Sequence, residues 1–218
     1  EAAVVQETQL KAPREAFFLY LSAFQEDMLN EDLQAQLEKL AGPSDNWDVY
    51  VQVLEQAVEV MSETARKITT WLRIGEIYSE NLGEDEAGQA AFNKALEMDT
   101  GNRQAIYALE AIYRKLHRDE DLIRILKLRL SLVVEPDERK AVRFEIAEAL
   151  YERLNKIDEA IETFNDILAD DLNEWRAYAE LSEILLKEKR FVELRELLNR
   201  HVDALFSMPE LDAPALAD

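Results

Sequence analysis

The amino-acid sequence repeats itself at a fixed interval of 72 residues. A shift of 72 places lays residues 14–133 on residues 86–205 with no gap, although this span crosses several loops. Apolar residues then fall on apolar ones, as in the pairs Ile74/Ile146, Leu82/Leu154, Phe92/Phe164, Leu109/Leu181, Ile112/Ile184 and Leu126/Leu198. Identical polar residues also coincide, among them Glu76/Glu148, Glu80/Glu152, Lys115/Lys187 and Arg118/Arg190. Unrelated amphipathic helices would lose register at the first loop, so the match indicates a tandem repeat.

Within each repeat the apolar residues have the spacing of amphipathic helices, not the alternation of strands. Turn-forming residues separate the segments at Pro13, Gly42 and Pro43, Gly83, Gly101, Pro136 and Asn173. We therefore expect an all-α chain in which each repeat holds two helical hairpins of about 34 to 38 residues. The expected helices lie near residues 2–11 (a truncated half), 14–28, 30–42, 46–62, 65–81, 85–98, 102–116, 119–134, 137–154, 157–169, 173–188 and 190–206.

One of these hairpins carries a known pattern. Trp71, Ile74, Gly75 and Tyr78, followed by Gly88 and Phe92, resemble the tetratricopeptide repeat, in which Trp, Leu-Gly and Tyr are later followed by a small residue and Phe. The second-helix part recurs as Ala16 with Tyr20 and as Ala160 with Phe164. The chain departs from the pattern at Arg143, which stands at the Trp position, at Leu122 and Leu194, which replace the small residue, and at Thr100 and Leu172, which replace the final Pro.

The resemblance implies a degenerate, bacterial-type array: a right-handed α-solenoid of stacked antiparallel helix hairpins whose first helices line a concave groove. On this basis we expect residues 1–206 to form a single repeat domain of about five hairpins, with the 72-residue double unit as its period. Residues 207–218 are acidic, contain two Pro and read as a tail or linker.

Charge and composition narrow the classes of partner. The net charge is −21, which opposes binding to the phosphate backbone of nucleic acids, and no apolar run is long enough to span a membrane. The absence of Cys excludes disulfides and thiol chemistry, but it does not separate the cytoplasm, slightly favoured, from an exported location. The sequence therefore reads as a soluble protein that binds other proteins or peptides.

No motif for catalysis, cofactor binding or metal ligation is recognisable. The only two His, His117 and His201, fall on Lys189 and Arg129 under the 72-residue shift, which favours a role as surface cations. A carboxylate-based helical hydrolase stays a remote alternative, because 46 acidic residues supply candidate pairs without marking any of them. We expect a non-enzyme without cofactor or metal.

The resemblance also implies which residues line the groove and face a partner. This predicted groove comprises Leu72, Arg73, Glu76, Tyr107, Phe144, Glu145, Glu148, Tyr151, Glu180 and Glu183. Its apolar side chains and carboxylates suit a basic or amphipathic segment of a partner. The Lys and Asn that clamp a C-terminal carboxylate in some members of the family are replaced by Leu72 and Glu76, which disfavours an acidic C-terminus as ligand.

Other interpretations also remain open at this point. Acidic side chains on helix faces commonly serve only to keep the surface solvated. Phe144 belongs to the core if its helix is rotated because Arg143 occupies the Trp position. Trp71 is expected in the core, and Trp47 and Trp175 are expected to staple helix starts against the neighbouring hairpin. The chain could alternatively be a structural spacer, or self-associate, through the ends of the array.

Overall fold

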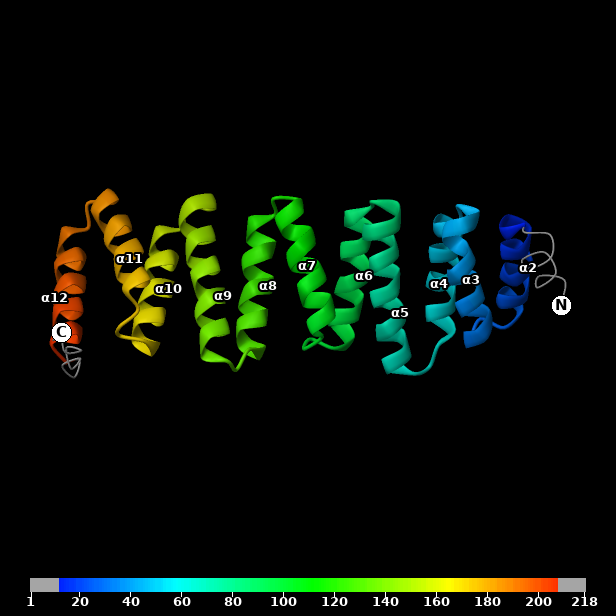
Figure 1. Cartoon of the computed structure of the whole chain (residues 1–218), viewed down its shortest axis with the longest axis horizontal. Helices are drawn as coiled ribbons and strands as arrows, with labels where there is room; N and C mark the ends of the chain where they lie inside the picture. Colours follow the sequence, from blue (N-terminus) through cyan, green and yellow to red (C-terminus); the bar gives the residue numbers. More distant parts are fainter. Residues whose placement is uncertain (1–11, 208–218) are drawn as a thin grey trace, which may run out of the picture. The chain divides into compact units, whose positions relative to one another are not determined.

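The structure is a computed structural model that describes residues 12–207 (Figure 1). Within this range the chain forms eleven α-helices, two π-helical segments and no strand. The elements are α2 (Pro13–Glu26), α3 (Glu31–Ser44), α4 (Trp47–Val60), α5 (Thr64–Glu76), η1 (Ile77–Leu82), α6 (Asp85–Met98), α7 (Arg103–Lys115), α8 (Asp119–Leu132), α9 (Pro136–Glu148), η2 (Ala149–Arg153), α10 (Ile157–Asp170), α11 (Trp175–Lys187) and α12 (Phe191–Ser207). The predicted all-α hairpin architecture is confirmed, whereas the helix expected near residues 2–11 and the tail after Ser207 lie outside the described residues.

The chain divides into two compact units, Glu1–Leu116 and His117–Asp218. In the first unit, α2 packs on α3, α5 packs on both α4 and α6, and α6 packs on α7. In the second unit, α9 packs on α8 and α10, and α11 packs on α10 and α12. Within each unit, consecutive helices run in opposite directions and are joined by short turns, so each unit is built from antiparallel hairpins (Figure 1).

A close helix contact forms at the two glycines of the repeat pattern. A Cβ added to Gly75 would lie 2.7 Å from the Phe92 ring, and one added to Gly88 would lie 3.1 Å from the carbonyl oxygen of Gly75. Both distances are shorter than ordinary van der Waals contacts between carbon and its neighbours. The small residues therefore let α5 and α6 approach each other, as the repeat pattern predicts.

The second unit has a hydrophobic core at the equivalent position of the repeat, and that core is formed by different side chains. Phe144 and Phe164 meet edge to face, with ring centroids 6.0 Å apart, in a core that also contains Tyr178, Leu181 and Leu197. Arg143, at the position that Trp71 occupies in the first unit, forms an ion pair with Asp170. Its neighbour Phe144 supplies the buried aromatic ring instead.

The turns obey the 72-residue period in their backbone conformation. Among the described residues, positive φ angles occur at Asp45 (56°), His117 (52°) and Lys189 (58°), which are spaced by 72 residues. The same spacing relates Gly83 (71°) to Asn155 (53°). The repeat is therefore a repeat of backbone geometry as well as of apolar positions.

The helix-starting tryptophans behave differently from each other. Trp47 packs beside Tyr50, with ring centroids 6.2 Å apart, and the guanidinium of Arg73 lies 5.9 Å from the centre of its ring. Trp175 is 71% exposed, so the expectation that it staples α11 against a neighbouring hairpin is wrong. At this helix start the Glu174 side chain accepts a hydrogen bond from the backbone N–H of Arg176, and the adjacent indole is exposed.

None of the helices described is both long and apolar enough to cross a lipid bilayer.

Candidate functional site

Each unit contains a cavity at the same position of the repeat. Cavity A, in the first unit, has a volume of about 340 Å³ and is lined by Glu76, Ser79, Glu80, Asp85, Phe92, Gln104, Ala108, Ala111, Ile112 and Lys115. Cavity B, in the second unit, has a volume of about 290 Å³ and is lined by Glu148, Tyr151, Glu152, Phe164, Glu180, Glu183, Ile184 and Lys187. Every residue that lines cavity B falls on a residue of cavity A under the 72-residue shift. The two cavities are thus the same feature, formed twice.

The walls of both cavities come from the same elements of the hairpin. The end of the first helix (α5 or α9) and the π-helical segment after it (η1 or η2) form one wall. The next first helix (α7 or α11) forms the other wall, and its Ile forms the floor together with the Phe of the second helix (α6 or α10). π-Helical turns are rare and widen the helix locally, and they are frequent at functional sites.

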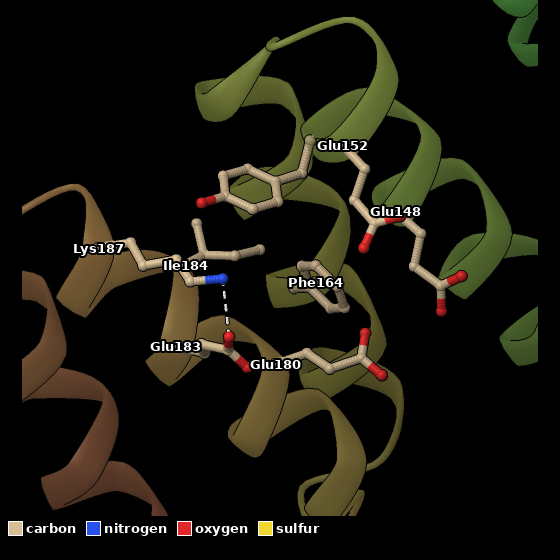
Figure 2. Close-up of a pocket in the computed structure, with 8 residues that line it drawn as sticks. Glu148, Glu152, Phe164, Glu180, Glu183, Ile184 and Lys187 are labelled. Carbon is tan, nitrogen blue, oxygen red and sulfur yellow. Dashed lines mark ion pairs between the residues drawn. The ribbon is translucent and has the colours of Figure 1, made fainter.

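Cavity B is surrounded by carboxylates. Glu148 and Glu152 lie on one wall and Glu180 and Glu183 on the other, with the Phe164 ring between them (Figure 2). The Nζ atom of Lys187 lies 2.7 Å from Oε1 of Glu183. This ion pair lowers the pKa of Glu183 and raises that of Lys187.

Arg176 joins the two walls of cavity B at one end. Its guanidinium donates to Oε1 of Glu180 at 2.6 Å and to Oε1 of Glu148, and it covers the Phe144 ring at 4.2 Å from the centroid. Burial, followed by the negative charge of Glu180, raises the pKa of Glu148 even though Arg176 opposes this shift. The charged form of Glu148 is thus disfavoured first by burial and then by the neighbouring carboxylates.

Cavity A has three acidic side chains, one fewer than cavity B, and two of them are paired. Oε2 of Glu76 accepts a hydrogen bond from Arg73 and Oε1 accepts one from Gln104, both at 2.7 Å. The Nζ atom of Lys115 lies 2.6 Å from Oδ2 of the buried Asp85. Glu80, exposed to solvent, is the remaining acidic residue of the lining. The wall on α7 is formed by Ala108 and Ala111, where α11 carries Glu180 and Glu183.

The structure brings together four of the predicted groove residues, Glu148, Tyr151, Glu180 and Glu183, in cavity B. It places Glu76 in cavity A, with Arg73 bound to it and also to Glu38 at 2.8 Å. Tyr107 is 45% exposed on α7 but lines neither cavity, and Glu145 is half-buried beside Glu148 without lining cavity B.

Two predicted anchors lie elsewhere. Leu72 and Phe144 are only 7% and 5% exposed, so they belong to the core and do not present an apolar surface to a partner. The two residues are equivalent under the 72-residue shift, so this position of the repeat is buried in both units, beside Trp71 in one and beside Arg143 in the other. The apolar lining of the cavities comes instead from Phe92 and Ile112, and from Phe164 and Ile184, which the 72-residue shift had already paired.

The histidines and acidic groups do not form a metal centre in the described part of the chain. No set of three or more His, Asp or Glu residues there is placed to hold a metal ion. His117 is exposed at a turn, and the imidazole of His201 stacks on the Tyr178 ring with centroids 4.0 Å apart.

Comparison with protein families matches residues 68–102 to the family described as tetratricopeptide repeat. No curated protein matches the sequence. Among solved structures, the chain is similar to MamA (TM-score 0.42, 16% identity, 76% of this chain and 90% of that chain). It is also similar to YrrB, described as a tetratricopeptide-repeat protein with an unusual peptide-binding site (TM-score 0.46, 16% identity, 86% of this chain and 93% of that chain). A third similar structure is the C-terminal part of a tetratricopeptide-repeat-containing protein from Cytophaga hutchinsonii (TM-score 0.47, 12% identity, 88% of this chain and 74% of that chain). The family match spans most of α5, all of η1 and α6, and therefore includes part of cavity A.

Proposed function

We propose that this tetratricopeptide-repeat protein is a non-catalytic interaction module that docks a basic or amphipathic segment of a partner protein at cavity B. One observation carries the proposal. Four carboxylates surround an apolar floor formed by Phe164 and Ile184. A segment with an apolar side chain and neighbouring Lys or Arg matches both parts of that surface.

The charges of the whole chain support the same class of partner. With a net charge of −21, the protein attracts basic segments from a distance and repels acidic ones. Long-range attraction of this kind raises association rates and weakens as salt is added.

The existing ion pairs favour recognition over hydrolysis. A carboxylate-based hydrolase needs two acidic groups open to the substrate. In cavity B, Arg176 binds both Glu148 and Glu180, and Lys187 binds Glu183. The four carboxylates of cavity B outnumber these two cations, so a cationic side chain of a partner can bind there without displacing either of them.

The proposal is tested with a fluorescent amphipathic helical peptide of Leu and Lys and its counterpart with Glu in place of Lys. Fluorescence anisotropy should detect binding of the basic peptide and none of the acidic one. The triple variant Glu148→Lys, Glu180→Lys, Glu183→Lys should weaken binding by about tenfold or more. Neutralisation to Gln at the same positions, which preserves side-chain shape, should give a smaller loss in the same direction.

A charge-matched control separates the site from the overall charge. Glu120, Glu162 and Asp166 are exposed in the same unit and line neither cavity. Their triple Lys variant changes the net charge equally and should retain most of the affinity. Equal losses in the two triple variants would show non-specific attraction, and the proposal would then be wrong.

A specific observation also favours a second candidate function, self-association through the end of the second unit. The last helix, α12, exposes a series of apolar side chains: Phe191, Val192, Leu198, Val202, Leu205 and Phe206. Apolar surface of this extent on a helix commonly marks a contact with another chain. The occupant that we consider is a second copy of this protein.

Sedimentation equilibrium over a range of concentrations tests this candidate. The chain should show a mass above that of the monomer, and Leu198→Asp with Val202→Asp should return it to the monomer. Val60→Asp, at an exposed apolar position of α4, serves as control. A monomeric mass at every concentration would remove the candidate and leave the docking function untouched.

A further inference from the structure

We infer that cavity A is a second docking pocket, and that it takes an uncharged apolar side chain of a protein partner where cavity B takes Lys or Arg. The inference extends the proposed function to the first unit and rests on it for the view that such cavities bind partners.

The two cavities share one frame, so their differences are few. Five of the eight equivalent lining positions are identical: Glu76/Glu148, Glu80/Glu152, Phe92/Phe164, Ile112/Ile184 and Lys115/Lys187. The remaining three are Ser79/Tyr151, Ala108/Glu180 and Ala111/Glu183. Two of these three replacements remove a carboxylate from the same wall, and all three put a smaller residue in cavity A.

The smaller residues of cavity A change what it can hold. Its volume is about 340 Å³ against about 290 Å³ in cavity B. Ala108 and Ala111 line cavity A together with Phe92 and Ile112, the floor residues that it shares with cavity B. An aliphatic or aromatic side chain placed there would lose contact with water against apolar atoms on the α7 wall and on the floor.

The charges of cavity A give a cation little to bind. Both carboxylate oxygens of Glu76 already accept hydrogen bonds, and Asp85 is paired with Lys115. A guest Lys or Arg would have to displace one of these partners, and it would gain only the solvent-exposed Glu80. In cavity B, by contrast, four carboxylates are set against Arg176 and Lys187, whereas in cavity A three carboxylates are set against Lys115 and the neighbouring Arg73.

The repeat itself supplies matched reporters for a test. Ile112 and Ile184 are equivalent residues, one in each cavity, so their methyl signals respond to the occupant of one cavity only. We would label the isoleucine methyl groups of the whole protein and titrate it with N-acetyl-leucine methylamide and with N-acetyl-arginine methylamide. The leucine derivative should shift the Ile112 signal and bind there about threefold or more tightly than at Ile184. The arginine derivative should show the reverse preference, and added salt should weaken it.

Exchange of the distinguishing residues should exchange the preferences. Ala108→Glu with Ala111→Glu should make the Ile112 signal respond to the arginine derivative. Glu180→Ala with Glu183→Ala should make the Ile184 signal respond to the leucine derivative. The second variant shortens side chains that are at least partly exposed, so it decides the matter even if the first fails to fold. Ser79→Tyr and Tyr151→Ser can be added to complete each exchange.

The outcomes separate this inference from the proposed function. If both derivatives shift both methyl signals equally, or if the exchanges leave the preferences unchanged, cavity A is not a pocket of distinct preference and the inference is overturned. If the basic peptide fails to bind at cavity B while Ile112 still prefers the leucine derivative, the proposed function falls and the assignment of cavity A stands.

Discussion

At the scale of single residues, the turns show that backbone geometry is repeated more strictly than residue type. The left-handed position in the turn between the two helices of a hairpin is filled by Asp45, His117 and Lys189, which are an acidic residue, an imidazole and an amine. A non-glycine residue in this conformation carries steric strain of about 1 to 2 kcal/mol. The sequence could predict a turn at these places, but only the 72-residue shift revealed that His117 and Lys189 are equivalent.

The strain leads to a prediction about stability. Lys189→Gly should raise the free energy of unfolding by up to about 1 kcal/mol, because Gly relieves the left-handed strain at an exposed position. Gly83→Ala should lower the free energy of unfolding by about 1 kcal/mol, because Ala is strained at the positive φ of this position even though no atom lies within 4 Å of the added Cβ. Urea denaturation followed by circular dichroism measures both, and a destabilised Lys189→Gly variant would contradict the strain argument.

A second prediction at this scale concerns the close contact between α5 and α6. Gly75→Ala should lower the free energy of unfolding by about 1 to 3 kcal/mol, because its Cβ would lie 2.7 Å from the Phe92 ring. Gly42→Ala is the matched control. The nearest atom to its added Cβ is 3.5 Å away on Trp47, so better helix propensity should leave stability unchanged or raise it. Equal effects of the two substitutions would mean that the contact is not tight.

At the scale of elements, the helices were predictable and their π-helical ends were not. Apolar spacing predicted continuous helices over residues 65–81 and 137–154, whereas α5 ends at Glu76 and α9 at Glu148, and η1 and η2 follow. A segment of five or six residues is too short to show its own periodicity, which is why the spacing cannot reveal it. The consequence is functional, since Ser79 and Glu80, like Tyr151 and Glu152, reach the cavities from these segments.

Burial of individual groove residues was also beyond the sequence. The repeat pattern assigned Leu72 and Phe144 to the groove, but both are buried, because this position of the first helix packs into the core in each unit. Glu148, Tyr151, Glu180 and Glu183 were placed on one surface because their positions depend only on helix geometry and on the pairing of adjacent hairpins.

The elements that meet at cavity B give binding a predictable pH dependence. The pKa of Glu148 is raised by burial and by Glu180, with smaller contributions from Glu152 and Glu145 and with Arg176 opposing. As the pH falls, Glu148 is therefore protonated before an ordinary Glu, and a bound cation must compete with that proton. The affinity for the basic peptide should decrease on acidification, by up to about tenfold over the titration of Glu148.

Anisotropy titrations of the basic peptide at successively lower pH measure this dependence. In the variant Glu148→Gln the decrease should begin at lower pH, because the carboxyl that titrates first is gone. If the variant and the original protein lose affinity over the same pH range, Glu148 does not contribute to the binding site.

At the scale of the whole molecule, duplication with divergence accounts for the arrangement of sites. The same cavity is built in both units from the same elements, while a few replacements on one wall change its charge. The period and the hairpins could be predicted from the sequence because apolar positions are shared between the two copies. The cavities could not, because they depend on gaps left by side chains and on ion pairs such as Lys115 with Asp85.

The central claim is that a basic segment docks on cavity B, and paramagnetic broadening tests it most directly. The basic peptide would carry a nitroxide, and the isoleucine, leucine and valine methyl groups of the protein would be labelled. We predict that the Ile184 signal broadens on addition of the peptide, and that it stays sharp in the Glu148→Lys, Glu180→Lys, Glu183→Lys variant. Broadening confined to Leu198 and Val202 of α12, with Ile184 unaffected, would contradict the account.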